Sequence, residues 1–166
     1  MFRTLAIQIT ICFFAFQLLS FFREASMLNT DITIQSINKE NQSFHLSTIT
    51  GDNISLQSQG KTTVIYFFAP WCQVCHASIG NLQTIFQNNE HVDVVAVALD
   101  YKSSKEVMKF AQKHQLTFPV ALGNAKIKQE FAISGYPSYY VLDENNIIKA
   151  KSIGYSSELG LYLRSL

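Results

Sequence analysis

Residues 62–76 read TTVIYFFAPWCQVCH, and this stretch decides which fold the chain can adopt. Its first part is rich in β-branched and aromatic residues and is apolar along most of its length, which predicts a strand buried on both faces. From Cys72 to about Asn88 the apolar side chains recur at helical spacing, so we expect a helix whose first turn carries Cys72 and Cys75. A buried strand that runs directly into a helix predicts an α/β fold built around this junction.

The sequence on either side continues the alternation of strands and helices. Residues 32–37 (ITIQSI) and 43–49 (SFHLSTI) alternate apolar with polar side chains and predict a short antiparallel pair that leads the domain. Residues 51–60 are expected to form a loop. Further strands are expected at 91–100, 117–122, 138–143 and 146–154, and helices at 103–115, 124–133 and 156–166. This order predicts a mixed sheet with helices on both faces.

The N-terminal segment carries no charged residue between Arg3 and Arg23. About 20 apolar residues cross a bilayer as a helix, so this run predicts a single span. A cleaved signal peptide is the alternative, but the bulky side chains of Phe21 and Phe22 occupy the place where cleavage requires small residues. Positive charge on both flanks specifies the orientation only weakly, and we favour the N-terminus inside and the domain outside. The expected organisation is an anchor or signal at 1–23, a linker at 24–30 and one domain at 31–166.

The net charge and the cysteine content limit the classes of function that the chain can have. The formal net charge of +1 offers no basic field for nucleic acid, so we expect no partner of that class. Of the three cysteines, Cys12 lies in the apolar run, which leaves only Cys72 and Cys75 in the domain. A domain of this size does not need a disulfide to supplement its core. The pair is therefore expected to be functional.

Two cysteines three residues apart at the start of a helix can perform redox chemistry. Side chains at this spacing lie on the same helix face, so Cys72 and Cys75 can close a reversible disulfide. Only the thiolate attacks a disulfide, and the positive end of the helix dipole favours the thiolate. Cys72, nearest that end, is the expected nucleophile, and Cys75 is expected to resolve the mixed disulfide.

Three other uses of the cysteines remain as alternatives. Cys72, Cys75 and His76 have the spacing that attaches a c-type haem, but such proteins enclose the porphyrin in a mostly helical shell. Soft thiolates also suit Cu(I) and zinc, although a closed zinc site needs four ligands and the other histidines lie at no ligand-like spacing. A permanent disulfide would add little stability, because the loop that it closes is short. We therefore expect no cofactor and no metal.

Two stretches resemble a known family. Residues 64–76 (VIYFFAPWCQVCH) resemble the thioredoxin active-site segment, and residues 133–154 (ISGYPSYYVLDENNIIKAKSIG) look like the second thioredoxin signature. The resemblance covers roughly 31–166. The leading hairpin, the added strand and helix, and the anchor are similar to the membrane-tethered TlpA, ResA and DsbE/CcmG-like proteins, possibly the ScsD-like group. It implies a thioredoxin fold with an N-terminal β-hairpin extension and an inserted strand-helix, preceded by one transmembrane helix.

The resemblance also implies roles for individual residues. A cis proline opposes the dithiol in this family, and Pro137 matches it, which would hold the backbone at Tyr136 in position to pair with an extended client. Trp71 is expected either to pack or to dock the client. The implied site comprises a redox-active disulfide between Cys72 and Cys75, the docking residues Trp71, Tyr136 and Pro137, and four residues that tune the ionisation of the thiols, Gln73, Val74, His76 and Tyr66.

Two carboxylates of the relatives are missing from this chain. Ser78 stands where ResA-like and CcmG-like members carry a glutamate, and Tyr66 stands where thioredoxin has a buried aspartate. Cys75 must lose its proton by another route, so water or Tyr66 is the expected substitute. His76 occupies a position usually held by Lys or Arg, and its protonated form would favour the thiolate.

The resemblance further implies partners and location. The partners would be protein thiol and disulfide clients, a membrane electron donor of the DsbD or CcdA type, and membrane lipid around residues 4–22. The expected location is the bacterial inner (cytoplasmic) membrane, with a single span and the catalytic domain on the periplasmic, extracytoplasmic side. The tethered relatives mostly act as reductants, so we expect a reductant. The residues themselves leave the direction of electron flow and the identity of the client open.

Overall fold

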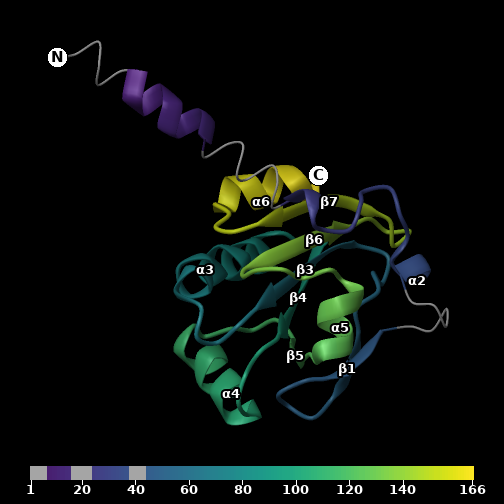
Figure 1. The fold of residues 1–166 in the computed structure, drawn as a ribbon. Helices are drawn as coiled ribbons and strands as arrows, with labels where there is room; N and C mark the ends of the chain where they lie inside the picture. Colours follow the sequence, from purple (N-terminus) through teal and green to yellow (C-terminus); the bar gives the residue numbers. More distant parts are fainter. Residues whose placement is uncertain (1–6, 16–23, 38–43) are drawn as a thin grey trace.

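The computed structural model describes residues 7–15, 24–37 and 44–166 (Figure 1). Its strands are β1 (His45–Ser47), β2 (Asn53–Ser55), β3 (Thr62–Phe68), β4 (Val92–Ala98), β5 (Val120–Leu122), β6 (Ser138–Leu142) and β7 (Ile148–Ile153). Its helices are α2 (Ile34–Ile37), α3 (Gln73–Asn88), α4 (Ser104–Lys113), α5 (Ala125–Glu130) and α6 (Glu158–Ser165). The central sheet has the order β5-β4-β3-β6-β7, and β1 and β2 form a separate two-stranded sheet. The predicted mixed sheet with helices on both faces is confirmed.

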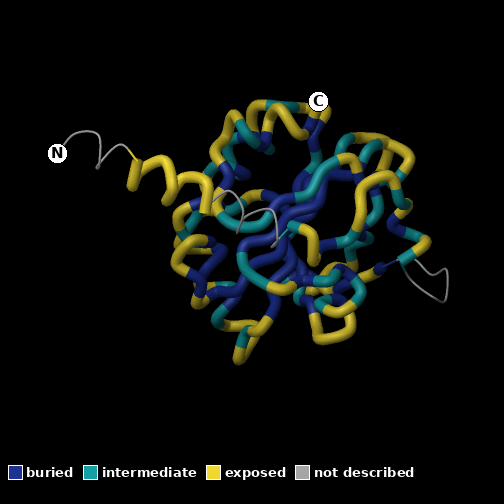
Figure 2. Tube along the Cα trace, turned by 45° about the horizontal axis from the view of Figure 1, so that its top comes forward, coloured by how far each residue is buried: buried dark blue, intermediate teal, exposed yellow. Residues whose placement is uncertain are grey.

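Strand β3 is the middle strand, and its side chains alternate between two cores. Val64, Tyr66 and Phe68 face the core to which α3, α4 and α6 contribute. Ile65 and Phe67 face the core that includes residues of α2, β1 and α5. Burial on both faces explains why this strand reads as a continuous apolar run, and the sheet forms the dark blue centre of Figure 2.

The leading hairpin lies later in the chain than predicted. Residues 32–37 were expected to form its first strand, but Ile34–Ile37 form helix α2. Ile34 and Ile37 are three residues apart, so both face the core from one helical turn, whereas an extended strand would point them to opposite faces. The hairpin instead pairs β1 with β2, which falls in the predicted loop. The chain reverses at Gly51, whose φ of 95° is a conformation that glycine adopts without strain.

The remaining predicted elements are present with shorter bounds. The helix expected at 124–133 ends at Glu130, because Ala132 adopts a φ of 48°. The amide of Ile133 then donates to the carbonyl of Lys128, and the amide of Ala132 to that of Gln129. This arrangement terminates a helix through a left-handed residue.

The N-terminal part of the chain was expected to be an anchor and a linker. Residues 7–15 are helical and exposed, whereas residues 1–6 and 16–23 of the predicted anchor lie outside the described residues. Within the described ranges, no helix is long and apolar enough to cross a membrane. Residues 24–30, the predicted linker, lie against the domain: Met27 is buried, and the amide of Leu28 donates to the hydroxyl of Tyr140 at 3.0 Å.

Three loops meet at one edge of the sheet. Strands β3 and β4 are parallel, so they end at the same edge, and β6 runs antiparallel to β3 and begins there. Phe67 accordingly lies opposite both Val97 and Ser138. The loops that follow β3 and β4 and the loop that precedes β6 are therefore neighbours, which brings Cys72 and Pro137 together from distant parts of the sequence.

Candidate active site

Cys72 caps the N-terminus of α3. The helix begins at Gln73, one residue later than predicted, and Cys72 itself has an extended backbone. Its sulfur accepts a hydrogen bond from the backbone amide of Cys75, with 3.2 Å between the nitrogen and Sγ. A sulfur in this position faces amides at the N-terminus of the helix that lack partners within the helix, and the positive end of the helix dipole. This environment suits a thiolate.

The two sulfurs differ in access to solvent. Cys72 is 7% exposed, whereas Cys75 is 0% exposed, and neither cysteine is in a disulfide. The thiol of Cys72 donates to the carbonyl oxygen of Tyr136 at 3.6 Å. Cys72 therefore lies beside the loop that precedes β6 and is less enclosed than Cys75.

The ionisation of Cys75 is suppressed. Burial raises the pKa of the Cys75 thiol far above its usual range, and the adjacent Cys72 thiol adds to the rise. The hydroxyl of Tyr66 acts in the opposite direction, because it hydrogen-bonds to the Cys75 side chain and lowers its pKa. Cys75 therefore remains a thiol at neutral pH in the reduced form.

Tyr66 and Ser78, which replace the two carboxylates of the relatives, are hydrogen-bonded to each other. Their oxygens lie 2.9 Å apart, and both residues are fully buried. The hydroxyl of Tyr66 also lies 3.4 Å from the carbonyl oxygen of Cys75. Burial raises the pKa of Tyr66 far above its usual range, so this residue does not become a phenolate near neutral pH. That water or Tyr66 substitutes for the missing carboxylate stays a prediction, and in the folded chain the Tyr66 hydroxyl is a neutral hydrogen-bonding group.

Trp71 and Tyr136 form an aromatic rim beside Cys72. Trp71 is 58% exposed, and its ring meets the ring of Tyr136 edge to face at 5.9 Å between centroids. Trp71 Nε1 donates to the backbone carbonyl of Asp100 at 3.0 Å, and the hydroxyl of Tyr136 donates to the Asp100 carboxylate at 2.9 Å. Asp100 thus holds both aromatic residues, and Lys128 forms an ion pair with its carboxylate.

The ionised form of Asp100 is favoured. The hydrogen bond from Lys128 lowers the pKa of this carboxyl below its usual value, and that from Tyr136 acts in the same direction. Asp100 has a φ of 48°, a left-handed conformation that Asp tolerates better than most residues. The ammonium of Lys128 also lies 5.6 Å from the centroid of the Tyr136 ring. These contacts connect α5 to the rim.

His76 is engaged at both ring nitrogens. Nε2 lies 3.0 Å from the carbonyl oxygen of Pro70, and Nδ1 lies 2.6 Å from Nε2 of His114. A carbonyl only accepts, so Nε2 of His76 carries a proton, and in the neutral pair Nδ1 accepts from His114. Burial, together with the charge of His76, lowers the pKa of His114. His76 therefore fixes the loop before Cys72 through Pro70.

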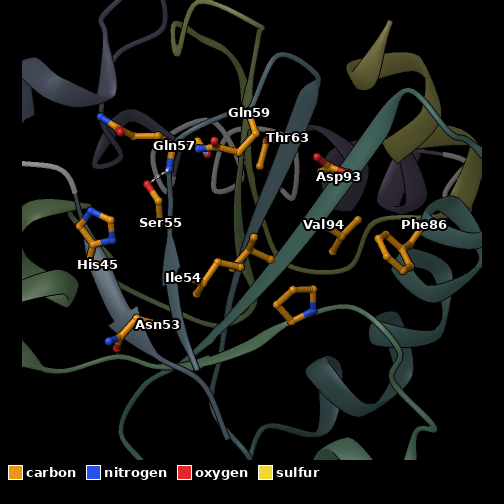
Figure 3. Close-up of a pocket in the computed structure, with 12 residues that line it drawn as sticks. His45, Asn53, Ile54, Ser55, Gln57, Gln59, Thr63, Phe86, Asp93 and Val94 are labelled. Carbon is orange, nitrogen blue, oxygen red and sulfur yellow. Dashed lines mark hydrogen bonds between the residues drawn. The ribbon is translucent and has the colours of Figure 1, made fainter. Parts of the chain in front are cut away.

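A cavity of about 580 Å³ lies away from the cysteines (Figure 3). It is bordered by the β1–β2 hairpin and by the first residues of β3 and β4, with His45, Gln57, Thr63 and Asp93 among its lining. Neither Cys72 nor Cys75 lines it. This cavity is therefore separate from the cysteine pair.

The sequence profile of the AhpC/TSA family matches residues 37–151. The chain belongs to the AhpC/TSA family. Among curated proteins it is 32% identical over 117 residues to the Thioredoxin-like protein YneN of Bacillus subtilis, covering 67% of this chain and 68% of that protein. It is also 27% identical over 116 residues to the Sporulation thiol-disulfide oxidoreductase A of Bacillus subtilis, covering 67% of this chain and 70% of that protein.

The solved structures agree with the family assignment. The crystal structure of StoA from Bacillus subtilis superposes with a TM-score of 0.67 at 26% identity, covering 75% of this chain and 97% of that chain. This AhpC/TSA family member has a thioredoxin-like α/β fold and is a thiol-disulfide oxidoreductase by class. The family and the thioredoxin-like α/β fold implied by the resemblance are confirmed, whereas the described residues contain no transmembrane helix.

Within this family member, the structure brings some of the predicted site residues together. The Tyr136–Pro137 peptide bond is cis, and Pro137 is buried at the edge of the sheet where Cys72 and Cys75 lie. Gln73 and Val74 are exposed on the first turn of α3, so their influence on the thiols remains a prediction. In the described part of the chain, no group of three or more His, Cys, Asp or Glu residues could hold a metal ion.

Three residues of the site were missed by the sequence analysis. Asp100, His114 and Lys128 contact the predicted residues from three other segments of the chain. Only Asp100 had a usable signal: it follows β4 at the edge where β3 ends, and polar residues at the carboxyl ends of parallel strands often serve a site. His114 directly follows α4 and Lys128 lies on α5, and neither position carries such a marker.

Proposed function

We propose that the chain exchanges disulfides with exported protein clients through Cys72 and Cys75. The observation that carries this proposal is the asymmetry of the two sulfurs. Cys72 is reachable at the helix N-terminus, whereas Cys75 is enclosed one turn further along and has a raised pKa. Such a pair supports an ordered reaction in which one sulfur attacks and the other resolves.

As a reductant, the chain would act in two displacement steps. The Cys72 thiolate attacks one sulfur of a client disulfide, and the other client sulfur leaves as a thiolate that takes up a proton. Cys75 then loses its proton and attacks Cys72, which releases the second client sulfur. Two electrons pass to the client, and Cys72 and Cys75 are left joined. A dithiol donor must then reduce this disulfide in the same two-step manner.

The rim around Cys72 suits an extended client. The Tyr136 carbonyl lies next to the Cys72 sulfur, so a strand that pairs with the backbone before Pro137 would bring its own disulfide to Cys72. Trp71 is largely exposed and would cover the apolar side chains of such a strand. Trp71, Tyr136 and Pro137 are the proposed docking residues.

Residues 4–22 are proposed as a membrane anchor that keeps the domain on the extracytoplasmic side of the bacterial inner membrane. The support is the uncharged sequence of this run and the bulky Phe21 and Phe22 at its end. A membrane donor of the DsbD or CcdA type is proposed to supply the electrons, by analogy with the tethered relatives. This arrangement favours a reductant.

Exchange of thiols and disulfides tests the proposal directly. The full chain in membranes, given a dithiol donor, should reduce a disulfide-bonded client protein, and Cys72→Ser should abolish the reaction. Cys75→Ser should instead accumulate a mixed disulfide between Cys72 and the client, which mass spectrometry detects. Cys12→Ser removes a cysteine outside the domain and should leave the rate unchanged.

Two results would contradict the assignment. Client reduction that survives Cys72→Ser would remove this residue as the nucleophile. A Soret band in the purified chain would instead support haem attachment at Cys72, Cys75 and His76. The burial of Cys75 argues against a thioether bond to a porphyrin, because the porphyrin would have to displace the packing around that residue.

A further inference from the structure

The outer side of α6 carries a stripe of exposed apolar side chains. Leu159, Tyr162 and Leu163 lie within the helix, Leu166 follows it, and all four are between 40% and 84% exposed. Residues at this spacing lie on one helix face, because each residue advances by about 100°. Leu161 lies on the inner face and is buried. Helix α6 is therefore apolar toward the core and also toward solvent; we call the four exposed residues the α6 stripe.

No charged side chain interrupts the α6 stripe. Glu158 and Arg164 are exposed and stand on opposite sides of it around the helix. Tyr155, just before the helix, is 58% exposed, and its hydroxyl accepts a hydrogen bond from Asn81 on α3. Figure 2 shows exposed residues along this helix near the C-terminus. A contiguous apolar surface of this kind marks contact with a partner or a membrane.

The chain enters the domain next to this helix. The Ser152 hydroxyl in β7 donates to Glu24 Oε1 at 3.3 Å, and Lys151 Nζ donates to the Met27 carbonyl at 3.4 Å. Met27 itself is buried, so the segment after the apolar run is fastened to β7. Helix α6 packs on both β7 and α3. Figure 1 shows α6 and β7 together at one end of the domain and α4 at the other.

The distance between the apolar run and this attachment is short. Residues 4–22 are uncharged, and a single residue separates them from Glu24. Two peptide units span at most about 8 Å, so a bilayer that holds residues 4–22 begins close to β7. Helix α6, which packs on β7, then lies at the lipid surface.

We propose that the α6 stripe rests in the interface of the bilayer that holds residues 4–22. The inference rests on the proposed anchor. Leucines would lie at the boundary of the acyl chains, and Tyr155 and Tyr162 would lie at the level of the headgroups. The domain is then held in one orientation on the lipid surface.

Quenching by brominated lipids tests this contact in the full chain. The chain is reconstituted into phosphatidylcholine and phosphatidylglycerol vesicles whose acyl chains carry bromine, which quenches nearby tryptophan. Trp71→Phe removes the native fluorophore, and Leu163→Trp places a reporter in the α6 stripe. Lys105→Trp, at an exposed position of α4, is the matched control. Thermal unfolding followed by circular dichroism verifies that both reporter variants fold.

The proposal expects strong loss of emission for Leu163→Trp and none for Lys105→Trp. An unquenched Leu163→Trp reporter in a chain that still floats with the vesicles would overturn the lipid contact and leave the anchor standing. If the chain does not float with the vesicles, the anchor and this inference both fail. Protection of the Leu163→Trp reporter from aqueous acrylamide without bromine quenching would assign the stripe to a protein partner and also overturn the proposal.

Discussion

Removal of the Tyr66 hydroxyl tests how this chain manages without a buried carboxylate. Tyr66→Phe deletes the group that contacts Ser78 at 2.9 Å and hydrogen-bonds to the Cys75 side chain. The ring stays in place against Phe68 and Tyr139, so the apolar packing is preserved. The substitution therefore isolates the contribution of one buried hydroxyl.

Two effects of Tyr66→Phe can be estimated. Ser78 is fully buried, and a buried hydroxyl without a partner costs about 1–3 kcal/mol. A serine in a helix can turn to the carbonyl four residues earlier, which places the loss near 1 kcal/mol, or roughly 2–4 °C in the unfolding midpoint. A hydrogen bond to a charged group is worth about 1.5–3 kcal/mol, so attack by the Cys75 thiolate should slow by roughly 10- to 100-fold.

Transfer of thionitrobenzoate separates the two steps. Cys72 first attacks the symmetric disulfide of thionitrobenzoate, which leaves a mixed disulfide on Cys72 and releases one coloured thiolate, and release of the second coloured thiolate then reports the attack by Cys75. Formation of the mixed disulfide should proceed at the wild-type rate in Tyr66→Phe, whereas release should be slow and should require higher pH, because the pKa of Cys75 rises further.

A double variant controls for stability. Tyr66→Phe with Ser78→Ala removes both hydroxyls, so no buried group is left without a partner, and most of the lost stability should return. Release should remain slow. Release at the wild-type rate in Tyr66→Phe would refute the idea that this hydroxyl supports the Cys75 thiolate.

Three further perturbations test other parts of the site. Asp100→Ala removes the acceptor of the Tyr136 hydroxyl and should raise KM for a client protein roughly fivefold, which corresponds to about 1 kcal/mol. Asp100→Asn keeps an acceptor and should have the KM of the wild type. Equal KM values for the wild type and both variants would argue against Asp100 as a positioning residue. The free energy of unfolding of the reduced chain, measured in urea, should fall as pH rises from about 10 to about 12. Burial raises the pKa of Tyr139 and Tyr140 to about 12, whereas unfolded tyrosines ionise near 10. A free energy of unfolding that does not change over this pH range would contradict the burial of these hydroxyls. Val74→Lys adds an exposed cation beside the thiols and should make the reduction potential, measured against glutathione, roughly 5–20 mV less negative. Val74→Met adds no charge and should leave the potential unchanged. An unchanged potential in Val74→Lys would show that position 74 does not tune the thiols.

The central elements of the fold could be predicted because local pattern and burial agree there. Strand β3 is apolar along its length because both of its faces are buried, and α3 and α4 carry apolar residues at helical spacing because one face of each packs on the sheet. The leading hairpin could not be placed, because residues 32–37 fit both a strand and a helical turn. The packing of Ile34 into the core stabilises the helical turn rather than the strand.

The placement of Cys72 and Cys75 near Pro137 could be predicted, and the contacts around them could not. Cys72 and Cys75 are neighbours in sequence, and Pro137 belongs to a recognisable segment. The contact of His76 with His114 joins residues 38 positions apart, and that of Tyr136 with Asp100 joins residues 36 apart. Such pairs depend on how the loops meet at the edge of the sheet, which the local sequence does not encode.

The order of the proposed reaction follows from how α3 leaves the sheet. Strand β3 carries the chain out of the core, Cys72 caps the helix at the surface, and Cys75 lies on its inner face with Ser78. Because burial keeps Cys75 protonated, it does not compete for the client and acts only on the mixed disulfide. The Tyr66 hydroxyl can stabilise the resulting thiolate but does not remove its proton, so deprotonation by water should limit the second step. The mixed disulfide should therefore be long-lived. Contacts of the client with Trp71 and Tyr136 should then contribute more to the reaction, because they hold the client for the whole lifetime of the mixed disulfide.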